Sequence, residues 1–115
     1  MSQQLPPVAQ DKLENLQSFQ AKAQQVTMQK HHTEAQLVDY KAALSTLSTT
    51  DTKASLYRHI GNLMVETSHN NAENDLNERI ESLELRLQAF SKQSDRIQKQ
   101  SEKLQKELQE LLNIP

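Results

Sequence analysis

The chain has 115 residues, of which 35% are apolar but only 3% are aromatic, and it contains a single Gly. A compact globular core needs large side chains at its centre, whereas Leu is the commonest apolar residue here. The formal net charge of -2 gives no field that would draw in nucleic acid or an anionic lipid surface. This composition is typical of long coiled-coil helices, with neither nucleic acid nor membrane as a partner.

The chain has no Cys, which excludes a disulfide framework, a thiolate metal site and a Cys nucleophile. It has no run of about 18 apolar residues that would span a membrane. Its first residues lack the basic and apolar regions of a signal peptide. We therefore expect a cytoplasmic protein.

The single Gly61 divides the chain into two similar arms, because neither Gly nor Pro occurs in residues 8–60 or 62–114. The first arm predicts a helix over residues 7–48, beginning near Pro7, since proline suits the first helical turn. Residues in this arm recur in alternating steps of three and four, the heptad spacing of a coiled coil. The first seam consists of Leu16, Phe19, Ala23, Val26, Lys30, Thr33, Leu37, Tyr40, Leu44 and Leu47.

The connector between the arms predicts a β-hairpin over residues 55–67. Its sequence is SLYRHIGNLMVET, in which β-branched, aromatic and long apolar residues flank Gly61-Asn62. Gly tolerates the positive φ that a two-residue type II′ turn requires at its first position. One face then carries Leu56, Arg58, Ile60, Leu63, Val65 and Thr67, and the other carries Tyr57, His59, Met64 and Glu66.

A two-stranded hairpin with apolar side chains on both faces and two unpaired edges is marginal in water. Two helices are too narrow to cover both faces, so other chains must complete the sheet. The expected oligomerisation residues are Leu56, Tyr57, Ile60, Gly61, Leu63, Met64 and Val65.

The second arm predicts a helix over residues 70–113, opened by a capping box from Asn70 to Glu73. Folding the arms antiparallel keeps both seams in register and places Leu47 opposite Leu76, and Leu16 opposite Leu108. Lys30 then meets Ser94; it either fixes the register or extends outward over Thr33. The second seam consists of Leu76, Ile80, Leu83, Leu87, Phe90, Ser94, Ile97, Ser101, Leu104, Leu108 and Leu111.

The hairpin sequence between two helices of equal length resembles the β-type subunits of prefoldin, a hexameric cochaperone. The opening LPPVAQDKLENLQ is similar to archaeal β-type subunits, and a single hairpin favours the β type over the α type. The segment SHNNAEN departs from the charged stretch common there, and we interpret it as loop variation. The resemblance implies a mainly α fold of one domain, residues 1–115: an antiparallel two-helix coiled coil whose β-hairpin joins an intersubunit β-barrel.

The resemblance also implies partners and a function without cofactor, nucleotide or enzymatic activity. Two α-type and four β-type subunits would form a hexamer whose distal coil ends hold unfolded polypeptide and pass it to a group II chaperonin. Near an open coil end the seam residues have no further layer above them, which favours the same role; alternatively they only close the coil. The client-binding candidates are Leu5, Val8, Leu13, Leu16, Leu108, Leu111, Leu112 and Ile114.

Two other functions compete with this interpretation: a structural coiled-coil tether or adaptor without client binding, and a nucleic-acid-associated coiled coil. Tethers need only helix, and the 13 Lys and Arg residues are dispersed rather than gathered into a basic stripe. His31 and His32 are adjacent and so diverge on a helix, which makes them surface residues rather than ligands of one metal. We expect no metal site and no catalytic residues.

Overall fold

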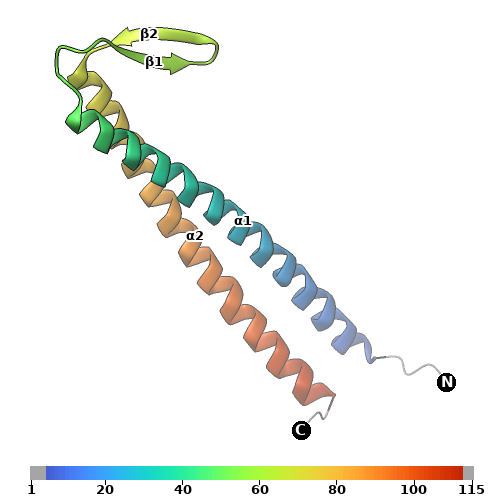
Figure 1. Ribbon diagram of the computed structural model, residues 1–115. Coiled ribbons are helices and arrows are strands. Elements are labelled where there is room, and N and C mark those ends of the chain that lie inside the picture. Colours follow the sequence, from blue (N-terminus) through green and yellow to red (C-terminus); the bar gives the residue numbers. More distant parts are fainter. Residues whose placement is uncertain (1–4, 113–115) are drawn as a thin grey trace. The chain divides into compact units, whose positions relative to one another are not determined.

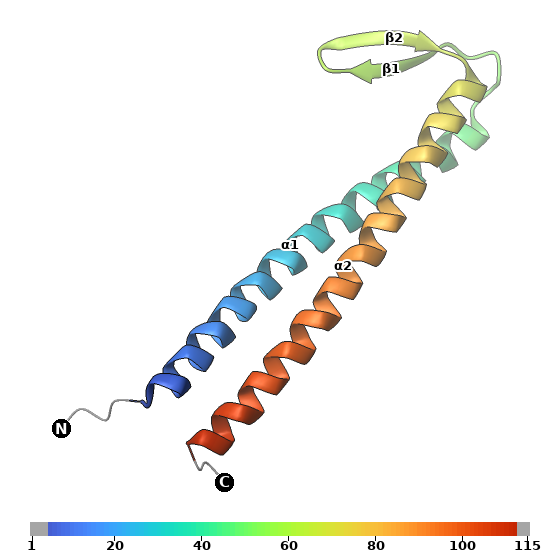
Figure 2. The same ribbon diagram turned by 180° about the vertical axis from the view of Figure 1, so that it is seen from behind.

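The computed structural model describes residues 5–112 and has four elements in chain order (Figures 1 and 2). They are α1 (Pro7–Thr49), β1 (Leu56–Ile60), β2 (Leu63–Thr67) and α2 (His69–Leu111). This arrangement confirms the predicted fold class of two long helices with one antiparallel β-hairpin between them. The helix boundaries lie close to those expected, although residue 113, the expected end of the second helix, is outside the described residues.

The chain forms two compact units. The first combines the described residues up to Lys30 with those from Ala89 onward, and the second is His31–Gln88. A piece of α1 lies beside a piece of α2 in each unit (Figures 1 and 2). That residues 1–115 form a single domain stays a prediction.

Burial follows the predicted seams. Leu16, Val26, Ile97 and Leu108 are buried in the first unit, and Thr33, Leu47 and Leu83 in the second. Every other seam position is half-buried except Leu111, which is exposed. No large side chain among the described residues is completely buried. In a pair of helices, each seam residue is covered only by the partner helix, and its outer side stays open to solvent. The heptad prediction is therefore confirmed.

Helix α1 begins and ends where its local hydrogen bonds change. The backbone N–H of Gln10 donates to the carbonyl of Pro6 at 2.9 Å, which places Pro7 at the first helical position as predicted. At the other end the hydroxyls of Ser48, Thr49 and Thr50 donate to carbonyls of the last turn. These side chains offer the backbone an alternative to the helical pattern, and a turn at Asp51 follows.

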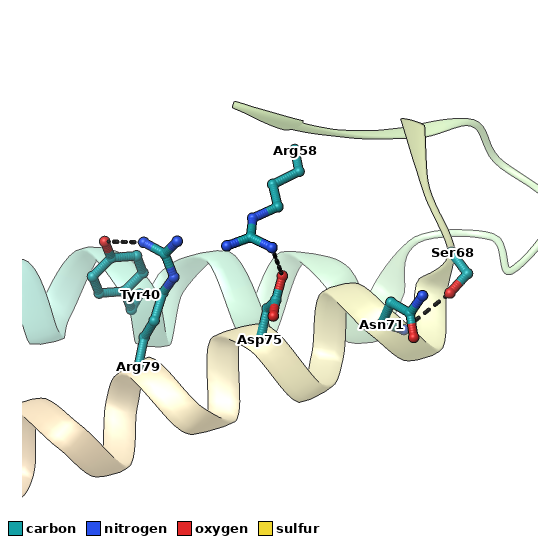
Figure 3. A network of polar contacts seen from close by, with 6 residues as sticks. All are labelled: Tyr40, Arg58, Ser68, Asn71, Asp75 and Arg79. Atoms are coloured by element: carbon teal, nitrogen blue, oxygen red, sulfur yellow. Dashed lines mark hydrogen bonds and ion pairs between the residues drawn. The ribbon is translucent and has the colours of Figure 1, made fainter. Parts of the chain in front are cut away.

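Helix α2 begins earlier than the predicted capping box would place it. The backbone N–H of Asn71 donates to the Ser68 hydroxyl at 3.0 Å, so Ser68 is the N-cap and the helix opens at His69 (Figure 3). The capping box at Asn70 and Glu73 is wrong, because Asn70 already lies within the helix. The interpretation of SHNNAEN as a loop is wrong for the same reason: the serine caps the helix and the residues after it form its first turns.

Candidate functional site

The hairpin has the predicted two-residue turn. β1 and β2 pair antiparallel with Ile60 opposite Leu63 and Leu56 opposite Thr67. Gly61 adopts a φ of +57°, a left-handed conformation that glycine enters without the steric cost other residues meet. Because side chains alternate along a strand, this register confirms the two predicted faces.

Both faces of the hairpin expose apolar side chains. On the face that carries Arg58, Ile60 and Leu63 are 48% and 66% exposed, and on the other face Tyr57 and Met64 are 57% and 63% exposed. Val65 is also exposed, whereas Leu56 is half-buried. The described residues contain no third strand, so both edges of this sheet are free to pair. The predicted oligomerisation residues thus lie together on one small sheet.

A cleft of about 460 Å³ separates the hairpin from the helices of the second unit, and it is lined by residues of all four elements. Arg58 of β1 crosses to α2, where its guanidinium lies 2.9 Å from the Asp75 carboxylate (Figure 3). One turn along α2, Arg79 donates to the Tyr40 hydroxyl at 2.9 Å and lies over its ring. At the base of the hairpin, a ring nitrogen of His69 lies 3.0 Å from the Leu47 carbonyl.

The first unit contains a terminal cluster, which we define as the apolar side chains where α1 begins and α2 ends. Leu16 and Leu108 are 7% and 8% exposed and pack with Ala9, which is completely buried. The cluster consists of Leu5, Ala9, Leu13, Leu16, Leu104, Leu108 and Leu112. Two of the client-binding candidates, Leu16 and Leu108, are thus the centre of a core.

Other client-binding candidates lie outside that core. Val8 is 56% exposed and Leu111 is 44% exposed, and neither belongs to the terminal cluster. Leu5, Leu13 and Leu112 are half-buried at its margin. Ile114 lies outside the described residues. The structure therefore divides the predicted set into residues that close the coil and residues that remain available to a ligand.

An ion pair lies beside the terminal cluster. The Lys12 ammonium is 2.5 Å from the Glu107 carboxylate, and the two side chains are 27% and 32% exposed. The hydrogen bond from Lys12 lowers the pKa of the Glu107 carboxyl below its ordinary value and outweighs the opposing effect of partial burial. This contact joins the first turns of α1 to the last turns of α2.

The remaining titratable residues show no arrangement that points to a metal site. Among residues 5–112, no group of His, Asp and Glu is placed to hold a metal ion. His31 and His32 are both exposed, as predicted, and His31 pairs with Glu34 on its own helix. No helix in this part of the chain is long and apolar enough to cross a membrane.

Comparison with known proteins decides the family. A family model described as prefoldin subunit matches residues 10–113. The chain belongs to the prefoldin subunit family. Its members are chaperone subunits, and prefoldin beta subunits are among its relatives. The beta subunit of Halobacterium salinarum is 46% identical over 70% of this chain, and the match spans 64% of that subunit's length, slightly under two thirds.

Further prefoldin relatives agree over a larger share of their length. The beta subunit of Pyrococcus horikoshii is 36% identical over 72% of this chain and 71% of its own. The crystal structure of the prefoldin beta subunit from Thermococcus strain KS-1 is similar with a TM-score of 0.88 and 32% identity. That similarity covers 99% of this chain and 100% of the solved chain, and it confirms the predicted resemblance.

Sequence reasoning missed several polar contacts of this prefoldin chain. The pairs Lys12–Glu107 and Lys41–Glu84 join the two helices beside the seams. Their signal was available, because opposite charges that flank an antiparallel seam face one another once the register is known. The Arg58–Asp75 pair had no such signal, since it depends on how the hairpin sits above α2.

Proposed function

We propose that this chain is a subunit of an ATP-independent holdase that binds unfolded polypeptide at the open ends of its helices. The observation that carries this proposal is the pair of exposed apolar side chains, Val8 and Leu111, beside the terminal cluster. Membership of a chaperone family supports it. The captured polypeptide is then delivered to a group II chaperonin in the cytoplasm.

Assembly proceeds through the hairpin. Its free edges and two apolar faces suit pairing with hairpins of other prefoldin subunits, in a hexamer of two α-type and four β-type chains that share a β-barrel. Apolar side chains exposed together on one small sheet are typical of a protein–protein interface, whereas single exposed apolar residues are normal on any surface. That the related chains are named subunits of prefoldin supports assembly with other subunits.

Client binding is weak at each chain and becomes stronger when several chains of one assembly bind the same client. A fully buried Val or Leu side chain contributes about 1.5–3 kcal/mol, so two half-exposed ones hold a peptide only at high concentration. Several chains in one assembly raise the effective affinity by avidity, without any requirement for a defined client sequence. Weak single contacts also suit release to a chaperonin.

The proposal is tested by removing the exposed apolar side chains without touching the core. The double variant Val8→Ser/Leu111→Ser, assembled with an α-type subunit, is compared with wild type for suppression of light scattering by a denatured client without ATP. We expect suppression to fall several-fold. The matched control is Val38→Ser/Leu85→Ser, which removes the same residue types at 65% and 59% exposure elsewhere on the two helices. We expect the control to act like wild type.

The result separates the competing functions. If Val8→Ser/Leu111→Ser and the control variant both suppress aggregation as well as wild type does, the client site lies away from Val8 and Leu111. If the wild-type assembly forms but suppresses no aggregation of any client, a structural tether or adaptor explains the chain better.

A further inference from the structure

Asp75 and Arg79 stand four residues apart on α2, with the acid first. Opposite charges at this spacing and in this order can pair along one helix and stabilise it weakly. Here they do not: Asp75 pairs with Arg58 of the hairpin, and Arg79 turns to Tyr40 of α1 (Figure 3). Both arrangements have good geometry, with 2.9 Å between the polar atoms in each. The Asp75 carboxylate thus pairs with the hairpin instead of forming an ion pair within α2.

Few other contacts fix the orientation of the hairpin relative to the helices of the second unit. The cleft of about 460 Å³ lies between it and the helices, so apolar packing does not fill this space. Within residues 5–112, Arg58–Asp75 is the one polar side-chain contact between a strand and a helix. The hairpin is joined to α1 by residues 50–55 and to α2 by Ser68 alone. The Arg58–Asp75 ion pair therefore spans the cleft and connects the hairpin to α2; we call this ion pair the strut.

We propose that Arg58 and Asp75 are positioning residues that orient the hairpin on the helices, and that Tyr40 keeps Arg79 from competing for Asp75. The proposal rests on assembly through the hairpin. Within the second unit, the angle between strands and helices decides the direction in which the helices leave an assembled sheet. A closed assembly requires that each copy presents its strands at a compatible angle.

Tyr40 suits this role because it holds Arg79 in two ways. Its hydroxyl accepts a hydrogen bond from Arg79, and its ring lies 5.5 Å from the guanidinium carbon, within the range of a cation–π contact. Tyr40→Phe removes the first contact and weakens the hold on Arg79, which lies one turn from the carboxylate. The freed guanidinium then competes with Arg58, and the hairpin spends more time released.

Distance measurement between spin labels tests the proposal, because the absence of Cys allows two labels at Asn62→Cys and Glu78→Cys. The labels report the separation of the hairpin tip from α2. They are placed in the full chain, alone and diluted with unlabelled chains in a complex with an α-type subunit. An exposed ion pair shifts such a positional equilibrium about two- to fivefold, so we expect Asp75→Asn to broaden the distance distribution in the free chain. Asp39→Asn is the control, since Asp39 is exposed on α1 of the same unit.

Three further variants separate orientation from general destabilisation. The charge reversal Arg58→Asp/Asp75→Arg should restore a narrow distribution. Tyr40→Phe alone should broaden it, and Tyr40→Phe/Arg79→Gln should narrow it again because the competitor is gone. A merely structural role of Tyr40 would not be rescued by a change at Arg79.

Two results of the distance measurement would overturn the proposal. A distribution in Asp75→Asn as narrow as in wild type overturns the strut, and failure of Arg79→Gln to rescue Tyr40→Phe overturns the competition. The mass of the complex is measured in parallel by sedimentation. Normal orientation without assembly would count against the proposed function, and assembly with unchanged orientation in Asp75→Asn would count against this inference.

Discussion

The Lys12–Glu107 contact shows how one ion pair ties the ends of two long helices together. The pKa of Glu107 is lowered in the folded chain by its hydrogen bond with Lys12. The deprotonated carboxylate therefore stabilises the folded state at pH values above the ordinary pKa of 4.5. That contribution is lost as the pH falls through the lowered folded-state pKa.

We predict that Glu107→Gln lowers the melting temperature at neutral pH and has little effect at an acidic pH below the lowered folded-state pKa, where the wild-type carboxyl is protonated too. Thermal unfolding followed by circular dichroism measures both values. Glu110→Gln serves as the control, because Glu110 is exposed on the same last turns of α2. An equal loss for Glu107→Gln at both pH values would show that packing, rather than charge, accounts for the effect.

The Ser68 hydroxyl caps the first turn of α2. It accepts from the N–H of Asn71 and so satisfies a backbone donor that has no partner within the helix. We predict that Ser68→Ala costs about 1 kcal/mol of unfolding free energy, the usual loss when an N-cap is removed. Asn70→Ala, inside the helix, should cost much less. Urea unfolding compares the two, and a larger loss at Asn70 would contradict the assignment of the cap.

The hairpin depends on the conformation of its turn. Gly61 has a φ of +57°, and a Cβ added there would meet no atom within 4 Å. The cost of Gly61→Ala is therefore backbone strain alone, about 1–2 kcal/mol for a left-handed conformation. Gly61→Asn should cost less, because Asn tolerates this region. The measurement is the dissociation midpoint of the complex with an α-type subunit in urea, and equal midpoints for both variants would argue against strain.

The elements differ in how well the sequence predicts them. Both helices and their seams follow from periodicity, because a heptad repeat of apolar residues has one stable solution, which is burial against another helix. The hairpin follows from Gly61 and the strand-forming residues around it. The start of α2 does not, since Ser68, Asn70 and Asn71 are all plausible caps and a local rule cannot rank them.

Burial at the ends of the helices also exceeds what periodicity can predict. Leu16 and Leu111 both occupy seam positions, yet Leu16 is buried and Leu111 is exposed. The heptad alone does not decide which of two neighbouring residues faces the partner helix: at the end of α2, Leu112 rather than Leu111 packs into the terminal cluster. The contact between Arg58 and Asp75 likewise requires knowledge of the hairpin's direction, which no spacing in the sequence encodes.

Assembly of the chain with other subunits should depend on the exposed apolar faces of the hairpin. We predict that Ile60→Asp abolishes assembly with an α-type subunit and leaves most of the helical circular dichroism, because burying an unpaired carboxylate costs several kcal/mol. Val38→Asp is the matched control, since Val38 is β-branched and 65% exposed on α1. Sedimentation measures the mass of each mixture. An intact complex with Ile60→Asp would show that this face of the hairpin is not buried on assembly.

The two units allow assembly and client binding to be separated by truncation. Residues 1–8 and 109–115 belong to the first unit, whereas the hairpin and its strut belong to the second. Removing both terminal segments takes away Val8 and Leu111 but keeps the buried centre of the terminal cluster, Ala9, Leu16 and Leu108. We predict that the truncated chain assembles with wild-type mass and suppresses client aggregation several-fold less well, with no ATP in either case. Sedimentation and light scattering at equal concentrations measure the two properties. Equal suppression would place the client site on the flanks of the helices or within the barrel, and would leave the terminal cluster with its packing role alone.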